Sequence, residues 1–117
     1  MKVSIVIPTW QGKALLRKNL PLLFQSLESS SHPVEVIVVD DGSSDGTPEV
    51  LARDFPRIQL VLHDKNRGFS AACLSGAEAA GGEVMILLNN DVIVTDNIVD
   101  PLLAYFQKED TFSVTPL

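Results

Sequence analysis

Two short polar segments of this chain carry residue types that could bind a metal ion or a nucleotide. The first is Asn89, Asn90 and Asp91, which directly follow the apolar run at residues 85–88. Magnesium commonly takes one or two carboxylates, with phosphates and waters completing its shell. Asn and Asp also favour Asx turns that simply open a loop. The segment therefore predicts either a site for Mg²⁺ or Mn²⁺ or a turn.

The second segment begins with the adjacent acids Asp40 and Asp41, which follow the apolar run at residues 34–39. Their carboxylates could accept hydrogen bonds from a base or a ribose. Gly42 and Ser43 come next, and this composition is equally typical of a turn. Both interpretations fit the residues alone.

Several single residues could add to such a site. Trp10, the single tryptophan, follows the first apolar run and could stack on a nucleobase or cover the rim of the core. Lys65 and Arg67 could face a diphosphate, although loop cations are usually just solvated. His32 and His63 have no pattern of metal partners nearby, so we interpret both as non-catalytic.

The composition excludes several classes of protein. The 117 residues correspond to one domain, and 45% hydrophobic with 21% charged residues is typical of a globular chain. A net charge of −6 with scattered Lys and Arg argues against nucleic acid or an anionic membrane as partner. Cys73 is the single cysteine, so an internal disulfide is impossible, and we expect a small buried residue there. No apolar run approaches the roughly 20 residues of a transmembrane segment.

Hydrophobic patterning predicts the elements that position these residues. Apolar runs predict strands at 3–7, ended by Pro8, and at 34–39, 58–62 and 84–88, with a fifth beginning at 112–114. Leucines at 16, 20, 23 and 27 predict a helix that Pro21 should kink or restart. Thr47 followed by Pro48 predicts an N-cap and first turn. Two more helices are expected at 69–80 and from 100 to about 108. The face of the first of these comprises Phe69, Ala72, Cys73, Gly76, Ala77 and Ala80.

The alternation of predicted strands and helices along the chain indicates a fold of the α/β class. Strands that are apolar at nearly every position are typical of a parallel sheet buried on both faces, hence of a three-layer, Rossmann-like arrangement. Ligands of such sheets bind at the carboxyl ends of the strands. A strand order of 3-2-1-4 would bring the polar loops after the first, second and fourth strands together.

Four motifs, taken in order, resemble those of family 2 glycosyltransferases, which have the GT-A fold. They are Val3–Trp10, Val38–Thr47, Asn66–Cys73 and Asn89–Val92. The resemblance covers almost the whole chain but only the nucleotide-binding half of the family. It implies a single domain, residues 1–117, truncated before the acceptor-binding half.

The resemblance also implies roles for individual residues. Pro8 and Trp10 would flank the pyrimidine base, and Asp41, with Asp40, would hydrogen-bond it. Asn90 would face the ribose or diphosphate, and Asp91 would ligate the divalent metal, Mg²⁺ or Mn²⁺. The remaining members of the implied nucleotide-binding set are Thr9, Asn66 and Gly68. Two departures from the family pattern are Asn89, where the metal motif has its first Asp, and Leu74, where many members carry Asn.

The implied activity is inverting transfer of a sugar from a nucleoside diphosphate donor, UDP- or dTDP-linked, to a glycan or lipid-linked glycan acceptor, as in polysaccharide biosynthesis. No residue of this chain matches the family's catalytic base, so we expect the chain alone to be inactive. The expected location is the cytoplasm or the cytoplasmic face of the membrane. A sheet edge exposed by truncation would favour a homo-oligomer.

Three alternatives remain open from the residues. A response-regulator receiver domain would need its acid pair after the first strand, where this chain has Pro8 and Thr9, and a Lys where it has Pro116. A dinucleotide-binding domain would need Gly-x-Gly-x-x-Gly after that strand, where only Gly12 is near. A non-catalytic module that binds sugar nucleotides or a partner on the same fold is the third.

Overall fold

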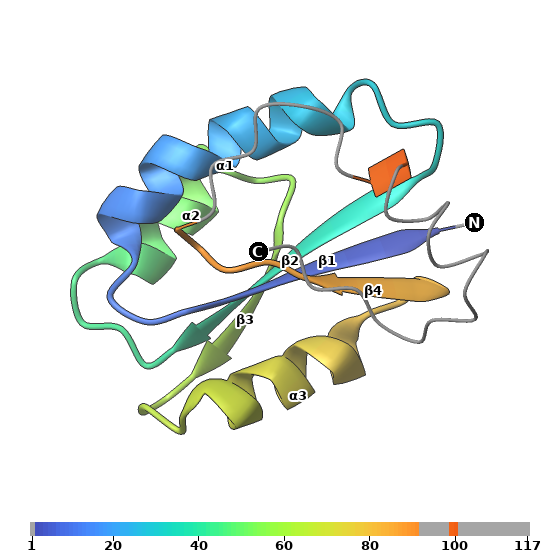
Figure 1. Cartoon of the computed structure of the whole chain (residues 1–117). Coiled ribbons are helices and arrows are strands. Elements are labelled where there is room, and N and C mark those ends of the chain that lie inside the picture. Colours follow the sequence, from blue (N-terminus) through green and yellow to red (C-terminus); the bar gives the residue numbers. More distant parts are fainter. Residues whose placement is uncertain (1, 92–98, 101–117) are drawn as a thin grey trace.

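The computed structural model describes residues 2–91 and 99–100. Along the chain the elements are β1 (Val3–Thr9), α1 (Lys13–Leu27), β2 (Val34–Asp41), α2 (Thr47–Asp54), β3 (Gln59–His63), α3 (Phe69–Ala79) and β4 (Val84–Leu87) (Figure 1). The fifth strand expected at 112–114, and the expected helix beyond Asp100, lie outside the described residues.

The four strands form one parallel sheet in the order β3-β2-β1-β4, which confirms the predicted order. The register places Thr9 beside Asp40 and Asp41 beside His63. The ends of β1, β2 and β3 therefore lie together at one edge of the sheet. Because the strand order reverses between β1 and β4, this edge also holds the switch point at which such sheets bind ligands.

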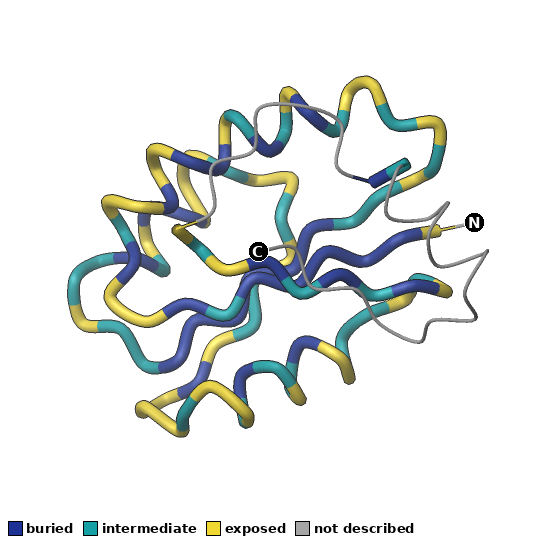
Figure 2. Tube along the Cα trace, in the orientation of Figure 1, coloured by how far each residue is buried: buried dark blue, intermediate teal, exposed yellow. Residues whose placement is uncertain are grey.

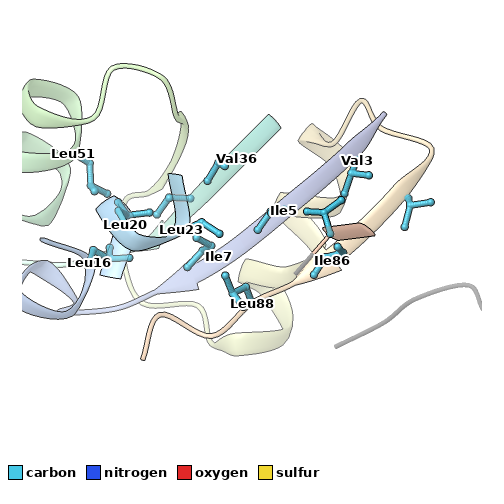
Figure 3. Close-up of a cluster of buried hydrophobic side chains, with 13 residues drawn as sticks. Val3, Ile5, Ile7, Leu16, Leu20, Leu23, Val36, Leu51, Ile86 and Leu88 are labelled. Carbon is cyan, nitrogen blue, oxygen red and sulfur yellow. The ribbon is translucent and has the colours of Figure 1, made fainter. Parts of the chain in front are cut away.

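The strands alternate their side chains between two apolar cores. Ile5 and Ile7 of β1 pack with α1 and α2 on one face (Figure 3). Val6 packs with Ala72 of α3 on the other face. Buried residues accordingly run along the strands and the inward sides of the helices (Figure 2). This confirms the three-layer arrangement.

The helix faces differ in how closely they follow the sequence pattern. Leu16, Leu20 and Leu23 are buried, as expected for α1. The expected face of α3 is too wide, because only Ala72 and Gly76 are buried in it. These two small residues let α3 pack closely against the sheet, whereas the larger side chains of the predicted face remain at its borders.

Three local expectations were wrong. Pro8 does not end β1, and it lies beyond the last β1–β4 pair, at Val6, so its missing N–H breaks no ladder there. Pro21 is exposed within an uninterrupted α1. Thr47 is not the N-cap, because Gly46 takes that place and the carboxylate of Asp45 accepts the Thr47 N–H at 3.1 Å.

Candidate functional site

An open pocket of about 440 Å³ lies at the carboxyl ends of the strands. Its walls come from the carboxyl ends of β1 and β2, from the segments that follow β1, β3 and β4, and from the start of α3. The lining residues are Pro8, Thr9, Trp10, Asp41, Asn66, Gly68, Phe69, Ala72, Asn89, Asn90 and Asp91. Every residue of the nucleotide- and metal-binding set that the resemblance implies, apart from Asp40, therefore contributes to one cavity.

Asp40 lies behind the wall of this pocket. It is 1% exposed, and its Oδ2 accepts the backbone N–H of Ser43 at 3.0 Å. Its Oδ1 is buried and has no hydrogen-bond partner among the described residues. The direct contact with a base expected of Asp40 does not fit this geometry. Asp40 shapes the turn after β2 and leaves Asp41 as the carboxylate that reaches the pocket.

Asp41 is held by three donors. Its Oδ1 accepts the Arg67 N–H at 2.9 Å and lies 2.7 Å from His63 Nδ1. Its Oδ2 accepts the Gly68 N–H at 2.9 Å. Gly68 adopts φ 100°, a conformation that side-chain-bearing residues rarely take, so glycine is needed to aim that N–H.

The electrostatics of Asp41 favour the ionised form. Burial, the largest influence, raises its pKa, but hydrogen bonds from His63, Arg67 N–H and Gly68 N–H outweigh it and lower the pKa below the ordinary value. At neutral pH Asp41 is therefore an acceptor-only carboxylate.

This depressed pKa predicts a loss of stability in acid. The contribution of Asp41 is fully present above its unfolded pKa of about 3.9 and is lost as pH falls through its lower folded value. Urea unfolding of the wild type and Asp41→Asn from pH 7 to 2 measures it. We expect the difference in unfolding free energy to shrink toward acid. Asp64→Asn, at an exposed loop position, controls for the lost charge. Parallel curves for the wild type and Asp41→Asn would contradict the assignment.

A second network ties the end of β4 to β1 and α1. Asn90 Nδ2 donates to Thr9 Oγ1 at 2.8 Å, and Asn19 Nδ2 donates to the Asn90 carbonyl at 2.9 Å. Gly12 packs beneath this junction, where an added Cβ would lie 2.1 Å from Thr9 Oγ1 and 2.7 Å from Asn90 Nδ2. The close approach fixes Asn90 and the following Asp91 at the pocket.

The turn after β2 is fastened to the segment after β1. Gln11 N–H donates to Ser43 Oγ at 2.7 Å, and Gln11 Oε1 accepts the Ser44 N–H at 2.7 Å. Lys13 N–H donates to Asp45 Oδ2 at 3.2 Å. These contacts hold two walls of the pocket at a fixed separation.

Two exposed aromatic side chains line the pocket. Trp10 follows β1 and is 55% exposed, and Phe69 begins α3 and is 63% exposed. The exposure of Trp10 favours the ligand-facing interpretation over the core-covering one. Phe69 was expected on the buried face of its helix, and its exposure at the pocket could not be seen from the periodicity.

The acidic end of the pocket fits a divalent cation only in part. Asp91 is exposed and stands beside Asn89 and Asn90. Across residues 2–91 and 99–100, no three His, Cys, Asp or Glu side chains are grouped so as to hold a metal by themselves. One carboxylate suits Mg²⁺ or Mn²⁺ when the ligand's phosphates complete the shell, as magnesium sites with nucleotides usually require.

The remaining predicted residues lie outside the pocket lining. Lys65 and Arg67 are exposed, and Arg67 contributes its backbone N–H rather than its charge. Cys73 is half-buried rather than fully buried, and burial raises the pKa of its thiol. His32 precedes β2, at the opposite end of that strand from Asp41, and its Nε2 lies 4.0 Å from Asp100 Oδ1. None of the helices in the described part of the chain has the length and apolarity that a bilayer crossing needs.

Sequence reasoning missed the contacts of His63, Ser75 and Asn19. His63 was interpreted as non-catalytic, yet it touches Asp41 directly. Its position as the last residue of β3 was the available signal, because parallel pairing places the ends of β2 and β3 side by side. Asn19 gave no comparable signal, since it occupies a helix position between core leucines.

Comparison with protein families gives a match over nearly the whole chain. The family model for glycosyl transferase family 2 matches residues 4–116. The undecaprenyl-phosphate 4-deoxy-4-formamido-L-arabinose transferase of Aeromonas hydrophila is 35% identical over 94 residues, covering 77% of this chain and 29% of that protein. The dolichol-phosphate mannosyltransferase of Pyrococcus furiosus is 31% identical over 108 residues, covering 88% of this chain and 29% of that protein. The chain thus spans about a third or less of the length of these relatives.

Two of the solved structures with the same arrangement hold a nucleotide sugar. S. aureus TarS 1-349 in complex with UDP-GlcNAc superposes with a TM-score of 0.72 at 22% identity, covering 94% of this chain and 32% of that one. The mannosyltransferase PcManGT from Pyrobaculum calidifontis, in complex with GDP-Man and Mn²⁺, gives a TM-score of 0.67 at 26% identity, covering 81% of this chain and 29% of that one. The four-stranded sheet of this chain therefore matches the GT-A fold of these neighbours.

Proposed function

The chain belongs to glycosyl transferase family 2, and we propose that it forms the donor-binding part of an inverting glycosyltransferase that uses a nucleoside diphosphate sugar. The observation that carries the proposal is the single pocket in which Trp10, Asp41, Asn90 and Asp91 meet. These residues come from three strand ends, and together they offer a stacking surface, a hydrogen-bond acceptor and a metal ligand.

The proposed donor carries uracil or thymine. Pro8 and Trp10 flank the base, and the Asp41 carboxylate accepts an N–H from it. Thr9, Asn66 and Gly68 line the same wall. Asn90, whose side chain donates a hydrogen bond to Thr9, would contact the ribose or the diphosphate. A donor of this kind matches the pocket's polar and aromatic lining, and a relative structure contains UDP-GlcNAc.

Asp91, supported by the amides of Asn89 and Asn90, would hold Mg²⁺ or Mn²⁺ against the diphosphate. When bound, such a metal acts as a Lewis acid that stabilises the departing nucleoside diphosphate. The protein's own contribution is to fix the base through Asp41 and the phosphate end through Asn90 and Asp91. The presence of Mn²⁺ in the complex of the Pyrobaculum mannosyltransferase supports this part of the proposal.

The proposed acceptor is inferred from the names of the relatives. Two of them are named for undecaprenyl phosphate and dolichol phosphate. A lipid-linked acceptor would place the whole enzyme at the cytoplasmic face of a membrane, and a glycan acceptor would leave it in the cytoplasm.

Thermal unfolding with a panel of nucleoside diphosphates, each with and without Mn²⁺, tests the donor proposal. We expect UDP or dTDP with Mn²⁺ to give the largest rise in melting temperature. A ligand at 100 times its Kd stabilises the folded state by about 2.7 kcal/mol. ADP and CDP serve as controls for non-specific binding of diphosphate. No rise with any nucleoside diphosphate would contradict the proposal.

A further inference from the structure

His63 connects the pocket to a part of α3 that takes no part in lining it. The imidazole is buried at the end of β3, with Nδ1 2.7 Å from Asp41 Oδ1 and Nε2 2.8 Å from Ser75 Oγ. Neither His63 nor Ser75 lines the pocket. The three side chains form a chain of contacts that runs from α3 through β3 to the carboxylate at the end of β2.

The hydrogen-bond roles along this chain follow from Asp41. Its ionised carboxylate can only accept, so His63 Nδ1 carries a proton and donates it. In the neutral imidazole Nε2 then accepts, and the Ser75 hydroxyl donates to it. Ser75 therefore holds the ring in the tautomer and orientation that present Nδ1–H to Asp41.

The connectivity of Ser75, His63 and Asp41 is that of a hydrolase triad, but the surroundings do not support hydrolysis. Ser75 sits inside α3, two turns from its start, where neighbouring backbone N–H groups belong to the helix. It lines no part of the pocket, so a substrate carbonyl held there would not reach it. The chain of contacts therefore acts on Asp41.

These contacts determine how many hydrogen bonds the Asp41 carboxylate can still accept from a ligand in the pocket. Each carboxylate oxygen offers two lone-pair positions. Oδ1 uses both, on His63 and the Arg67 N–H, whereas Oδ2 uses one, on the Gly68 N–H. A ligand can therefore add one donor to Oδ2. Uracil and thymine carry an N–H at ring nitrogen 3, whereas the corresponding nitrogen of cytosine is an acceptor that the carboxylate repels.

We propose that His63, held by Ser75, is a positioning residue that fixes the Asp41 carboxylate and thereby makes the pocket select bases with a ring N–H over cytosine. The inference rests on the proposed function. It assigns the selectivity to a residue outside the pocket, which acts by saturating Oδ1 and preventing the carboxylate from rotating to meet a different base.

The test compares the Kd of UDP and of CDP, with Mn²⁺, for the wild type and three variants. His63→Leu removes the donor to Asp41, and His63→Asn keeps an amide donor near the place of Nδ1. Ser75→Ala leaves the imidazole but removes its outer partner. A hydrogen bond to a charged group contributes about 1.5–3 kcal/mol, which corresponds to a change of about tenfold or more in the Kd of UDP.

We expect the wild type to bind UDP about tenfold or more tightly than CDP. In His63→Leu this ratio should fall toward one, mainly through weaker UDP binding. His63→Asn should keep most of the ratio, and Ser75→Ala should lie between the two. Circular dichroism and thermal unfolding establish that each variant folds. If His63→Leu does not fold, the contrast between His63→Asn and Ser75→Ala decides the question.

Three outcomes would contradict the inference, and they can be told apart. Variants that weaken UDP and CDP equally, leaving the ratio at its wild-type value, would show that His63 only supports the fold, while the donor proposal would stand. A wild type that binds neither UDP nor dTDP would overturn the donor proposal and the inference together. A nitrogen-15 NMR spectrum with the His63 proton on Nε2 rather than Nδ1 would also contradict the positioning role.

Discussion

Asp91→Asn is expected to abolish the enhancement by Mn²⁺ of UDP or dTDP binding. Asp91 is the single carboxylate of the motif at residues 89–91, and the structure places it in the pocket beside two amides. An amide is a weaker ligand than a carboxylate for a hard cation. Loss of an outer-sphere partner already costs a metal site about 10–100-fold in affinity, so loss of this ligand should cost at least as much.

Isothermal titration of UDP and dTDP into both proteins, with Mn²⁺ and with EDTA, measures this effect. We expect the two proteins to bind nucleotide alike in EDTA and to differ only when Mn²⁺ is present. Asn89→Asp is the matched variant in the opposite direction, because it adds a second carboxylate to the same segment and should strengthen the Mn²⁺ dependence. Equal enhancement in the wild type and Asp91→Asn would remove Asp91 from the metal site.

The architecture was predictable because its signals are local. Val36, Val38 and Val39 belong to a run with no polar interruption, and such a run is stable only between two apolar layers, here α1 with α2 on one side and α3 on the other. The carboxyl ends of the strands then had to share an edge. This is why the residues chosen after β1, β2 and β4 meet in one pocket.

The division of labour between Asp40 and Asp41 was not predictable from their order in the chain. Side chains alternate along a strand, and β2 continues through Asp41 rather than ending at Val39. Asp40 therefore points away from the pocket lining and holds the turn, while Asp41 contributes to the pocket. A shift of one residue in the strand's end would exchange these roles.

The contacts of His63 and Asn19 were missed for a different reason. Each depends on a tertiary register: β3 must pair with β2 so that His63 meets Asp41, and α1 must cross the sheet so that Asn19 meets the Asn90 carbonyl. The spacing of apolar residues along the chain specifies neither the register between β2 and β3 nor the way α1 crosses the sheet. The capping of α2 by Asp45 was predictable only in part. The sequence shows an acid two residues before Thr47, but it does not show the positive φ of Gly46.

The 117-residue chain by itself is expected to bind a nucleotide sugar but not to transfer the sugar at a normal enzymatic rate. Among the pocket-lining residues that the structure describes, the carboxylates are Asp41 and Asp91. Asp41 is buried among three donors and has a depressed pKa, so it is a poor proton acceptor. Asp91 is assigned to the metal. Neither is suited to deprotonate an acceptor hydroxyl, and lack of a positioned base typically costs about 10²–10⁴-fold.

The acceptor site makes the expected loss larger. Orienting two reactants supplies about 7–11 kcal/mol of barrier reduction, and the proposed donor would occupy the described pocket. The assay is release of nucleoside diphosphate from a panel of sugar nucleotides, with and without glycan and polyprenyl phosphate acceptors. We expect slow hydrolysis that no acceptor accelerates, with Asp91→Asn as the background control. Acceptor-dependent turnover of about 1 s⁻¹ or more would place a base and an acceptor site within this chain. The same slow rate in Asp91→Asn would instead show that the hydrolysis arises outside the pocket.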